Sequence, residues 1–181
     1  IEGYALPEGC ERAIDRQGIR AALGHLHDAG WTVQDGELRD ARGNPFVFEI
    51  LLNQSGSALR SSAETRQIVD IFVESLRNLG IRPKVTLLDS AQYVERTNNY
   101  QFDMTWYERG LSLSPGNEQM LYWGHDGVTN TGTKNWMGMN APAAEAMIAE
   151  MGHARSEEDY RASVRALDRI LTAGRYVIPV S

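Results

Sequence analysis

Three stretches of this chain end in the same way, with a helical apolar stripe followed by a glycine and then by extended sequence. The apolar stripes precede "AGW" at 29–31, "LGI" at 79–81 and "AGRY" at 173–176. Glycine tolerates the left-handed conformation that ends many helices, so Gly30, Gly80 and Gly174 are the predicted helix ends. Helices that alternate with strands along the chain indicate the α/β class.

The extended segments are the predicted strands, at residues 46–52 (FVFEILL), 84–88 (KVTLL), 102–107 (FDMTWY) and 176–180 (YVIPV). A helix predicted from near Leu59 to Leu79 is long enough for a right-handed crossover between the first two as parallel strands. A shorter helix at 90–98 leads to the third strand, and Ser156 is the predicted N-cap of a last helix. We therefore expect a single α/β domain over residues 1–181, with a mixed, mostly parallel sheet flanked by helices.

The turn signals and the apolar periodicity add two details to this fold. Asp-Gly and Gly-Asn-Pro in "DGELRDARGNPF" predict a small hairpin before the first long strand. The predicted core consists of strand and helix residues, namely Ile50, Leu52, Val85, Leu87, Ile68, Phe72, Leu76, Leu167 and Leu171.

Composition excludes several classes of function. The 181 residues carry a net charge of -6, and their Lys and Arg residues are scattered, which argues against nucleic acid as a partner. No apolar run approaches the roughly 20 residues of a membrane-spanning helix. Cys10 is the only cysteine, so no intrachain disulfide can form. The chain has no starting Met or signal peptide and stops inside a predicted strand, so we expect a fragment of a longer protein.

The carboxyl ends of the predicted parallel strands define a candidate binding face. They carry residues 53–57, 89–92 and 107–114, and open α/β sheets bind ligands in the crevice at this edge. Several aromatic rings and amides follow, a mixture suited to organic ligands. The alternative is that these rings fill the core beneath a long loop. Trp106 and Tyr107 alternate along a strand, so at most one of them faces the ligand through the strand itself.

Sequence motifs for catalysis are absent. The chain lacks G-x-G-x-x-G, a Walker loop, G-x-S-x-G and the metal spacing H-E-x-x-H, so we expect no cofactor and no metal. Two acids, Glu108 and Glu118, could act together in a carboxylate-dependent hydrolase such as a glycosidase. No set of nucleophile, base and orienting group can be assembled, so we expect no enzyme activity.

The segment "SPGNEQMLYWG" at 114–124 follows this edge of the sheet. Pro115-Gly116 allows a turn into a helix start, whose free amides could bind a ligand carboxylate or carbonyl. In the alternative interpretation Asn117 and Glu118 cap that short helix, and Tyr122 and Trp123 pack beneath it.

The order and spacing of three runs resemble a known family. "LGHLHDAGWTVQDGELRDARGNPFVFEILL", "DMTWYERGLSLSPGNEQMLYWG" and "ALDRILTAGRYVIPV" are similar to the second, C-terminal lobe of family 5 extracellular solute-binding proteins. These proteins are the oligopeptide and dipeptide receptors of ABC importers, and the resemblance is strongest to the branch for broad oligopeptide import, including microcin C uptake. The match spans nearly the whole chain.

The resemblance implies a periplasmic receptor whose two lobes close on a peptide and deliver it to ABC permease subunits. Many such receptors place an aspartate soon after the tryptophan of the third strand to pair with the ligand's amino terminus. This chain has none there, which leaves Glu108 or Glu118 as substitutes. We expect the ligand-binding side chains to be Trp106, Tyr107, Glu108, Arg109, Ser114, Asn117, Glu118, Asn135 and Trp136.

Overall fold

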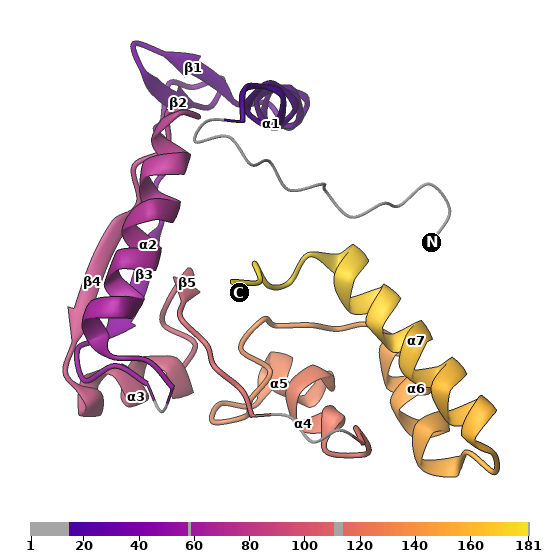
Figure 1. The fold of residues 1–181 in the computed structure, drawn as a ribbon. Helices are drawn as coiled ribbons and strands as arrows, with labels where there is room; N and C mark the ends of the chain where they lie inside the picture. Colours follow the sequence, from indigo (N-terminus) through magenta and orange to yellow (C-terminus); the bar gives the residue numbers. More distant parts are fainter. Residues whose placement is uncertain (1–14, 58, 111–113, 181) are drawn as a thin grey trace. The chain divides into compact units, whose positions relative to one another are not determined.

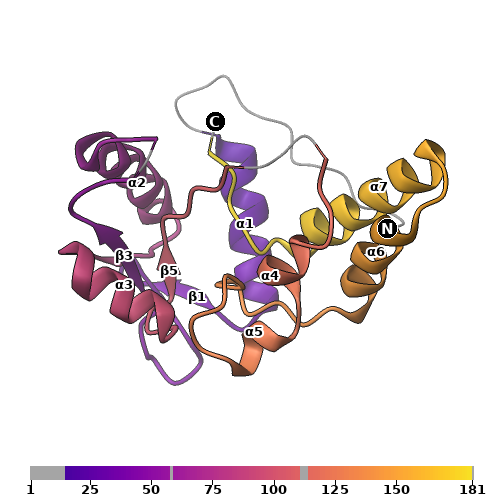
Figure 2. The same ribbon diagram turned by 90° about the horizontal axis from the view of Figure 1, so that it is seen from below.

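The computed structural model describes residues 15–57, 59–110 and 114–180 (Figures 1 and 2). These residues divide into two compact units. The sheet unit takes in the described residues of 15–96 and 102–108, and the helical unit those of 97–101 and 109–180. The single domain over residues 1–181 stays a prediction.

The sheet unit contains a three-stranded parallel sheet in the order β4-β3-β5. β3 (Glu49–Asn53) pairs with β4 (Lys84–Leu88) along its full length and with β5 (Met104–Thr105) at two positions. The predicted parallel sheet is therefore confirmed. β5 is shorter than the predicted strand at both ends. At its start the Asp103 carboxylate, instead of a strand carbonyl, accepts a hydrogen bond from the Glu49 backbone N–H at 2.8 Å.

Two helices connect these strands. α2 (Ser62–Arg77) begins in a capping box, in which Ser61 and Glu64 each accept a backbone hydrogen bond from the other. α3 (Ser90–Asn98) has the predicted bounds. Right-handed crossovers place the two helices on opposite faces of the sheet, as Figure 2 shows around β3. The face toward α2 holds one core cluster, in which Ile50, Leu52 and Val69 are buried.

The amino-terminal part of the sheet unit contains α1 (Arg16–Asp28) and a hairpin of β1 (Thr32–Gln34) and β2 (Glu37–Arg39). The hairpin turns at Asp35-Gly36, where both residues have positive φ. This confirms the predicted turn. Gly30 and Gly80 have φ of 88° and 75°, and the amide of the residue after each one bonds back to the preceding helix. Both predicted helix ends are therefore confirmed.

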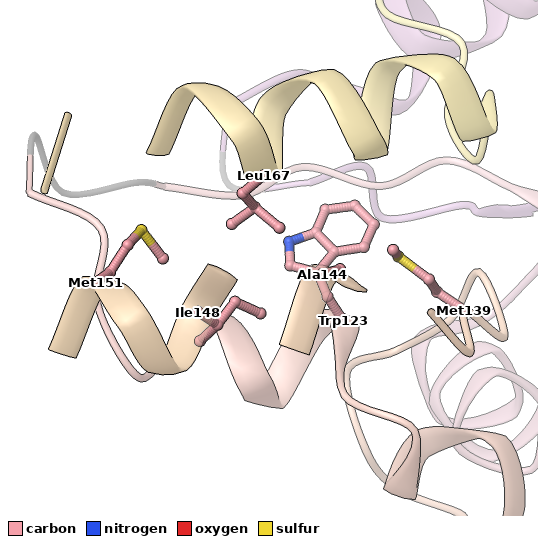
Figure 3. Packing of buried hydrophobic residues seen from close by; sticks show 6 residues of the cluster. All are labelled: Trp123, Met139, Ala144, Ile148, Met151 and Leu167. Carbon is pink, nitrogen blue, oxygen red and sulfur yellow. The ribbon is translucent and has the colours of Figure 1, made fainter. Parts of the chain in front are cut away.

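The helical unit contains four helices: α4 (Gln119–Trp123), α5 (Asp126–Thr129), α6 (Pro142–His153) and α7 (Glu157–Gly174). Ser156 caps α7 as predicted, because its side chain accepts the Asp159 amide. α6 and α7 lie side by side in Figure 1, and Figure 3 shows the Trp123 ring and Leu167 between them. The other buried members of this cluster are Met139, Ala144, Ile148 and Met151.

Three details of the predicted fold are wrong. α7 ends at Gly174 as predicted, but the left-handed conformation belongs to Arg175, with φ of 54°, and not to the glycine. Gly174 instead lies against the Tyr176 ring, where a Cβ would clash. Residues 176–180 form no strand, because their backbone pairs with no strand in either of the two described sheets. Leu87 is 39% exposed, since it lies on an edge strand.

Candidate functional site

The carboxyl edge of the parallel sheet is lined by polar side chains. β3 ends at Asn53, β4 at Leu88 and β5 at Thr105, so the loops that follow these strands leave the same edge. Ser90 Oγ lies 3.2 Å from Asn53 Oδ1 and 3.0 Å from Ser55 Oγ. The loops after β3 and β4 are thus joined by hydroxyl and amide groups. This is the edge at which α/β sheets bind ligands.

Glu108 lies at this edge and is fully engaged inside the protein. Its Oε2 accepts hydrogen bonds from Ser57 Oγ at 2.5 Å and from the Leu59 amide at 3.2 Å, while Oε1 accepts Trp106 Nε1 at 2.9 Å. These bonds, led by that of Ser57, lower the pKa of the Glu108 carboxyl. Glu108 therefore ties the loop after β3 to the end of β5. This role differs from the expected anchor for a ligand ammonium group.

The two aromatic residues after β5 are half-buried. The Trp106 ring packs against the core cluster beneath α2, and its carbonyl accepts a hydrogen bond from Tyr93 Oη at 2.9 Å. Trp106 thus serves the core as well as the sheet edge. Tyr107, its neighbour along the chain, is equally half-buried.

In the helical unit, residues 114–119 form a turn that leads into α4. Glu118 Oε1 accepts the Gly116 amide at 2.9 Å, which lowers the pKa of the Glu118 carboxyl. The first amides of α4 donate to the carbonyls of residues 116–118, and the helix has only five residues. The expectation of free helix-start amides is therefore wrong. Glu118 also makes no side-chain cap hydrogen bond to α4, so the cap interpretation fails for this residue.

Arg109 is held against the aromatic residues of α4. Its guanidinium carbon lies 4.0 Å from the centroid of the Tyr122 ring and 5.5 Å from that of Trp123. Arg109 Nη2 donates to Gln119 Oε1 at 3.0 Å, and the same oxygen accepts Trp123 Nε1 at 3.2 Å. Gln119 is buried, so a fixed amide and a flat ring orient the guanidinium.

The two candidate asparagines have different surroundings. Asn117 is exposed, and its side-chain amide makes no hydrogen bond to another residue in the described part of the chain. Asn135 is 1% exposed. Its Nδ2 donates to the carbonyls of Gly124 and Met139, and its Oδ1 accepts the Met139 amide. Asn135 therefore holds the loop between α5 and α6 to the end of α4, and its amide is not available to a ligand.

The remaining candidates are Ser114, which is exposed, and Trp136, which is half-buried. Sequence reasoning missed Ser57 and Gln119 as site residues. Ser57 lies in the predicted loop after the first strand, and this position at the carboxyl edge could have identified it as a site residue. Gln119 stood among the amides near the predicted edge, but only the structure reveals that its buried side chain joins Arg109 to Trp123.

The site offers little for acid catalysis or metal binding. A glycosidase needs one carboxyl group with a raised pKa, whereas the pKa values of Glu108 and Glu118 are both lowered. Among residues 15–57, 59–110 and 114–180 no group of three or more His, Cys, Asp or Glu residues could hold a metal ion. In the same ranges, no helix combines the length and apolarity that a bilayer crossing requires.

Comparison with curated proteins identifies relatives over almost the whole chain. The chain is 34% identical over 177 residues to the peptidoglycan-binding protein YepA of Agrobacterium fabrum, covering 98% of this chain and 28% of YepA. It is 31% identical over 177 residues to the probable peptide-binding protein YejA of the same organism, with 97% and 28% covered. The chain thus spans about a quarter of the length of the curated relatives it matches. No protein-family profile matches it.

Solved structures share the fold. The oligopeptide-binding protein AppA from Bacillus subtilis, in complex with a nonapeptide, superposes with a TM-score of 0.71 at 22% identity, over 87% of this chain and 30% of AppA. A periplasmic oligopeptide-binding protein from Thermotoga maritima, with bound mannohexaose, gives a TM-score of 0.76 at 19% identity, over 89% of this chain and 30% of that protein. The fold is therefore that of one lobe of a periplasmic binding protein.

Fold and relatives lead to the same class, the binding proteins: two of the curated relatives are named as such, and the fold is that of one lobe of a periplasmic binding protein. Within that class, the chain is a homologue of the family 5 solute-binding proteins, and the resemblance seen in the sequence is confirmed.

Proposed function

We propose that this chain is the C-terminal ligand-binding lobe of a solute-binding receptor of an ABC importer, located in the periplasm or elsewhere outside the cytoplasmic membrane. The main support is the parallel sheet, whose carboxyl edge bears polar loops. In addition, the chain is homologous to binding proteins over almost its whole length. The receptor takes oligopeptides and delivers them to permease subunits. It performs no chemistry on its ligand.

Three side chains are the strongest candidates for direct contacts. Arg109 offers a guanidinium oriented by Gln119 and Tyr122, which suits a ligand carboxylate. Asn117 offers an exposed amide that can both donate and accept. Tyr107 offers a ring in the sheet unit, and Ser114, Glu118 and Trp136 are further candidates in the helical unit. Trp106 and Glu108 act mainly by shaping the sheet edge.

A ligand screen on the full-length receptor tests this function. Three groups of ligands are tested, chosen from the ligands that appear in the names of the relatives and of the similar solved structures. They are a mixed peptide pool, peptidoglycan fragments and mannose oligosaccharides. A ligand that binds only the native state raises the melting temperature, so the peptide arm is expected to stabilise the receptor without being consumed. Stabilisation by oligosaccharides alone would replace the proposed ligand class. Hydrolysis that disappears in Glu118→Gln would establish the hydrolase instead.

The contact of Arg109 with a carboxylate has its own test. Peptides with a free carboxyl terminus are compared with the same peptides after amidation. The full-length receptor is expected to prefer the free acids by about tenfold or more, because a charged hydrogen bond contributes about 1.5 to 3 kcal/mol. Arg109→Met is expected to erase this preference in titration calorimetry. An unchanged preference would exclude Arg109 as the carboxylate contact.

A further inference from the structure

One hydrogen bond and one close approach link the 115–118 segment to the tip of the α6–α7 hairpin. Tyr160 Oη, near the start of α7, donates a hydrogen bond to the Pro115 carbonyl at 2.7 Å. At the last turn of α6, a Cβ built on Gly152 would lie 2.7 Å from Asn117 Oδ1, a separation that real Cβ atoms essentially never show. The Asn117 amide thus occupies the space that any other residue at position 152 would fill.

The hairpin is a firm support for this segment. α6 and α7 contact each other extensively, and Ile148, Met151 and Leu167 are buried between them. Tyr160 itself packs against this cluster. The backbone of the segment is also bonded to itself and to α4, through the Gly116 amide and the carbonyls of residues 116–118. The Asn117 side chain has no hydrogen bond in the described chain, so the hairpin supplies the Pro115 contact and the space in which that side chain lies.

We propose that Gly152 and Tyr160 are positioning residues for ligand binding, which hold the Asn117 amide in its binding conformation. The inference rests on the proposed function, in which Asn117 contacts the ligand. Both residues act through the segment: Gly152 leaves room for the Asn117 side chain, and Tyr160 fixes the carbonyl two residues before it. A segment that is ordered before binding loses less conformational freedom when the ligand arrives, so its order contributes to affinity.

The effect of a Gly152 side chain is expected to depend on Asn117. In the full-length receptor, with a synthetic random nonapeptide pool as the probe, Gly152→Ala is expected to weaken binding about tenfold, as Asn117→Ala does. In the Asn117→Ala background the clash is gone, so Gly152→Ala is expected to add nothing. Gly24→Ala is the matched control, because Gly24 lies in α1 with no atom within 4 Å of a Cβ, and affinity is expected to stay unchanged.

Tyr160→Phe tests the second contact, since it removes only the hydroxyl group. We expect a loss of affinity of about threefold to tenfold with little change in melting temperature. Tyr176→Phe is the control, because Tyr176 packs on the same cluster but its hydroxyl makes no hydrogen bond in the described chain. Equal effects of the two variants on affinity would overturn the role of Tyr160.

The outcomes separate the positioning role from the proposed function. If Gly152→Ala weakens binding equally with and without Asn117, the glycine acts on general stability and the positioning role is wrong. If the wild-type receptor binds no nonapeptide, the proposed function fails, but amide hydrogen exchange still tests the tether. Gly152→Ala is expected to speed exchange at residues 116–120 about tenfold, and Gly24→Ala to leave it unchanged. Unchanged exchange in Gly152→Ala would overturn the tether itself.

Discussion

At the scale of single residues, burial separates two asparagines that carry the same chemistry. Asn117 is exposed and its amide is available, whereas Asn135 uses both amide atoms to hold the backbone of its own loop. A side-chain amide in a core is retained only where all its partners are present, because an unmade buried hydrogen bond is costly. Asn117 is therefore the candidate for recognition and Asn135 the candidate for stability.

Asn135→Ala is expected to destabilise the chain by about 2 to 4 kcal/mol. The change leaves the carbonyls of Gly124 and Met139 and the Met139 amide buried without their partner, and it opens a cavity. Chemical denaturation measures the loss. Asn140→Ala, at an exposed position in the same loop, is the control and is expected to change stability by less than about 0.5 kcal/mol. Equal effects of the two variants would contradict the structural role.

Glu49 gives a second prediction at this scale, through pH. Hydrogen bonds from Arg96 at 2.6 Å and Thr86 at 2.5 Å, followed by the charges of Arg96 and Lys84, lower the pKa of the Glu49 carboxyl from 4.5 to about 2. A lowered pKa stabilises the folded state above the unfolded value of 4.5, and this stabilisation is lost as pH falls toward 2.

Glu49→Gln is therefore expected to cost about 1 to 3 kcal/mol at pH 7 and much less near pH 2.5. Urea unfolding at the two pH values measures the difference. The control is Glu74→Gln, which breaks the exposed ion pair with Arg77 in α2 and is expected to change stability by less than about 0.5 kcal/mol. A Glu49 effect that does not shrink at low pH would refute the linkage.

At the scale of helices and strands, the sequence predicted types and order well and faces less well. β4 and α3 have the predicted bounds, and both glycine-ended helices, α1 and α2, are present. Of the predicted core residues, Ile50, Leu52 and Leu167 are buried. On α2, however, Val69 is the buried aliphatic residue and Ile68 is half-buried. Apolar residues flank both sides of that stripe, so spacing alone could not fix the rotation of the helix.

The face of α2 can be tested by a pair of truncations. Val69 is 5% exposed beneath the helix, whereas Ile71 is 70% exposed on its outer side. Val69→Ala is expected to cost about 1 to 3 kcal/mol, since it removes buried methyl groups and leaves a cavity. Ile71→Ala is expected to change stability by less than about 0.5 kcal/mol, although it removes more atoms. Thermal and urea unfolding measure both, and the reverse order would mean that α2 is rotated.

The candidate site shows where sequence reasoning ends. Positions could be predicted, because parallel strands bring their carboxyl ends to one edge and the loops 53–57 and 106–108 had to lie there. Roles could not. Glu108 is consumed by hydrogen bonds to Ser57 and Leu59, far away in sequence, and Asn135 by bonds to the backbone of Gly124 and Met139. The place of Asn117 beside Gly152 depends on how α6 packs. Such pairings depend on three-dimensional neighbours, which no local pattern specifies.

At the scale of the whole molecule, this chain corresponds to less than a third of its relatives' length, which limits the number of ligand contacts that it can supply alone. It spans 28% of YepA and of YejA and 30% of AppA. Within it, a sheet edge and a tethered loop offer only a few polar contacts and rings. We infer that the remaining contacts to a peptide come from other parts of the full-length receptor, as in proteins that close around their ligands.

The isolated 181-residue chain is accordingly expected to bind peptide at least about a hundredfold more weakly than the full-length receptor. Binding restricts the rotation and translation of the peptide, and the free-energy cost of this restriction is nearly the same when only part of the contact surface is present. The favourable contacts are fewer, so affinity falls more steeply than the number of contacts. Titration calorimetry with the same nonapeptide on both proteins measures the ratio. Circular dichroism of the isolated chain is the control, because weak binding is informative only if the chain is folded. A dissociation constant equal to that of the full-length receptor would mean that this chain alone contains the complete binding site.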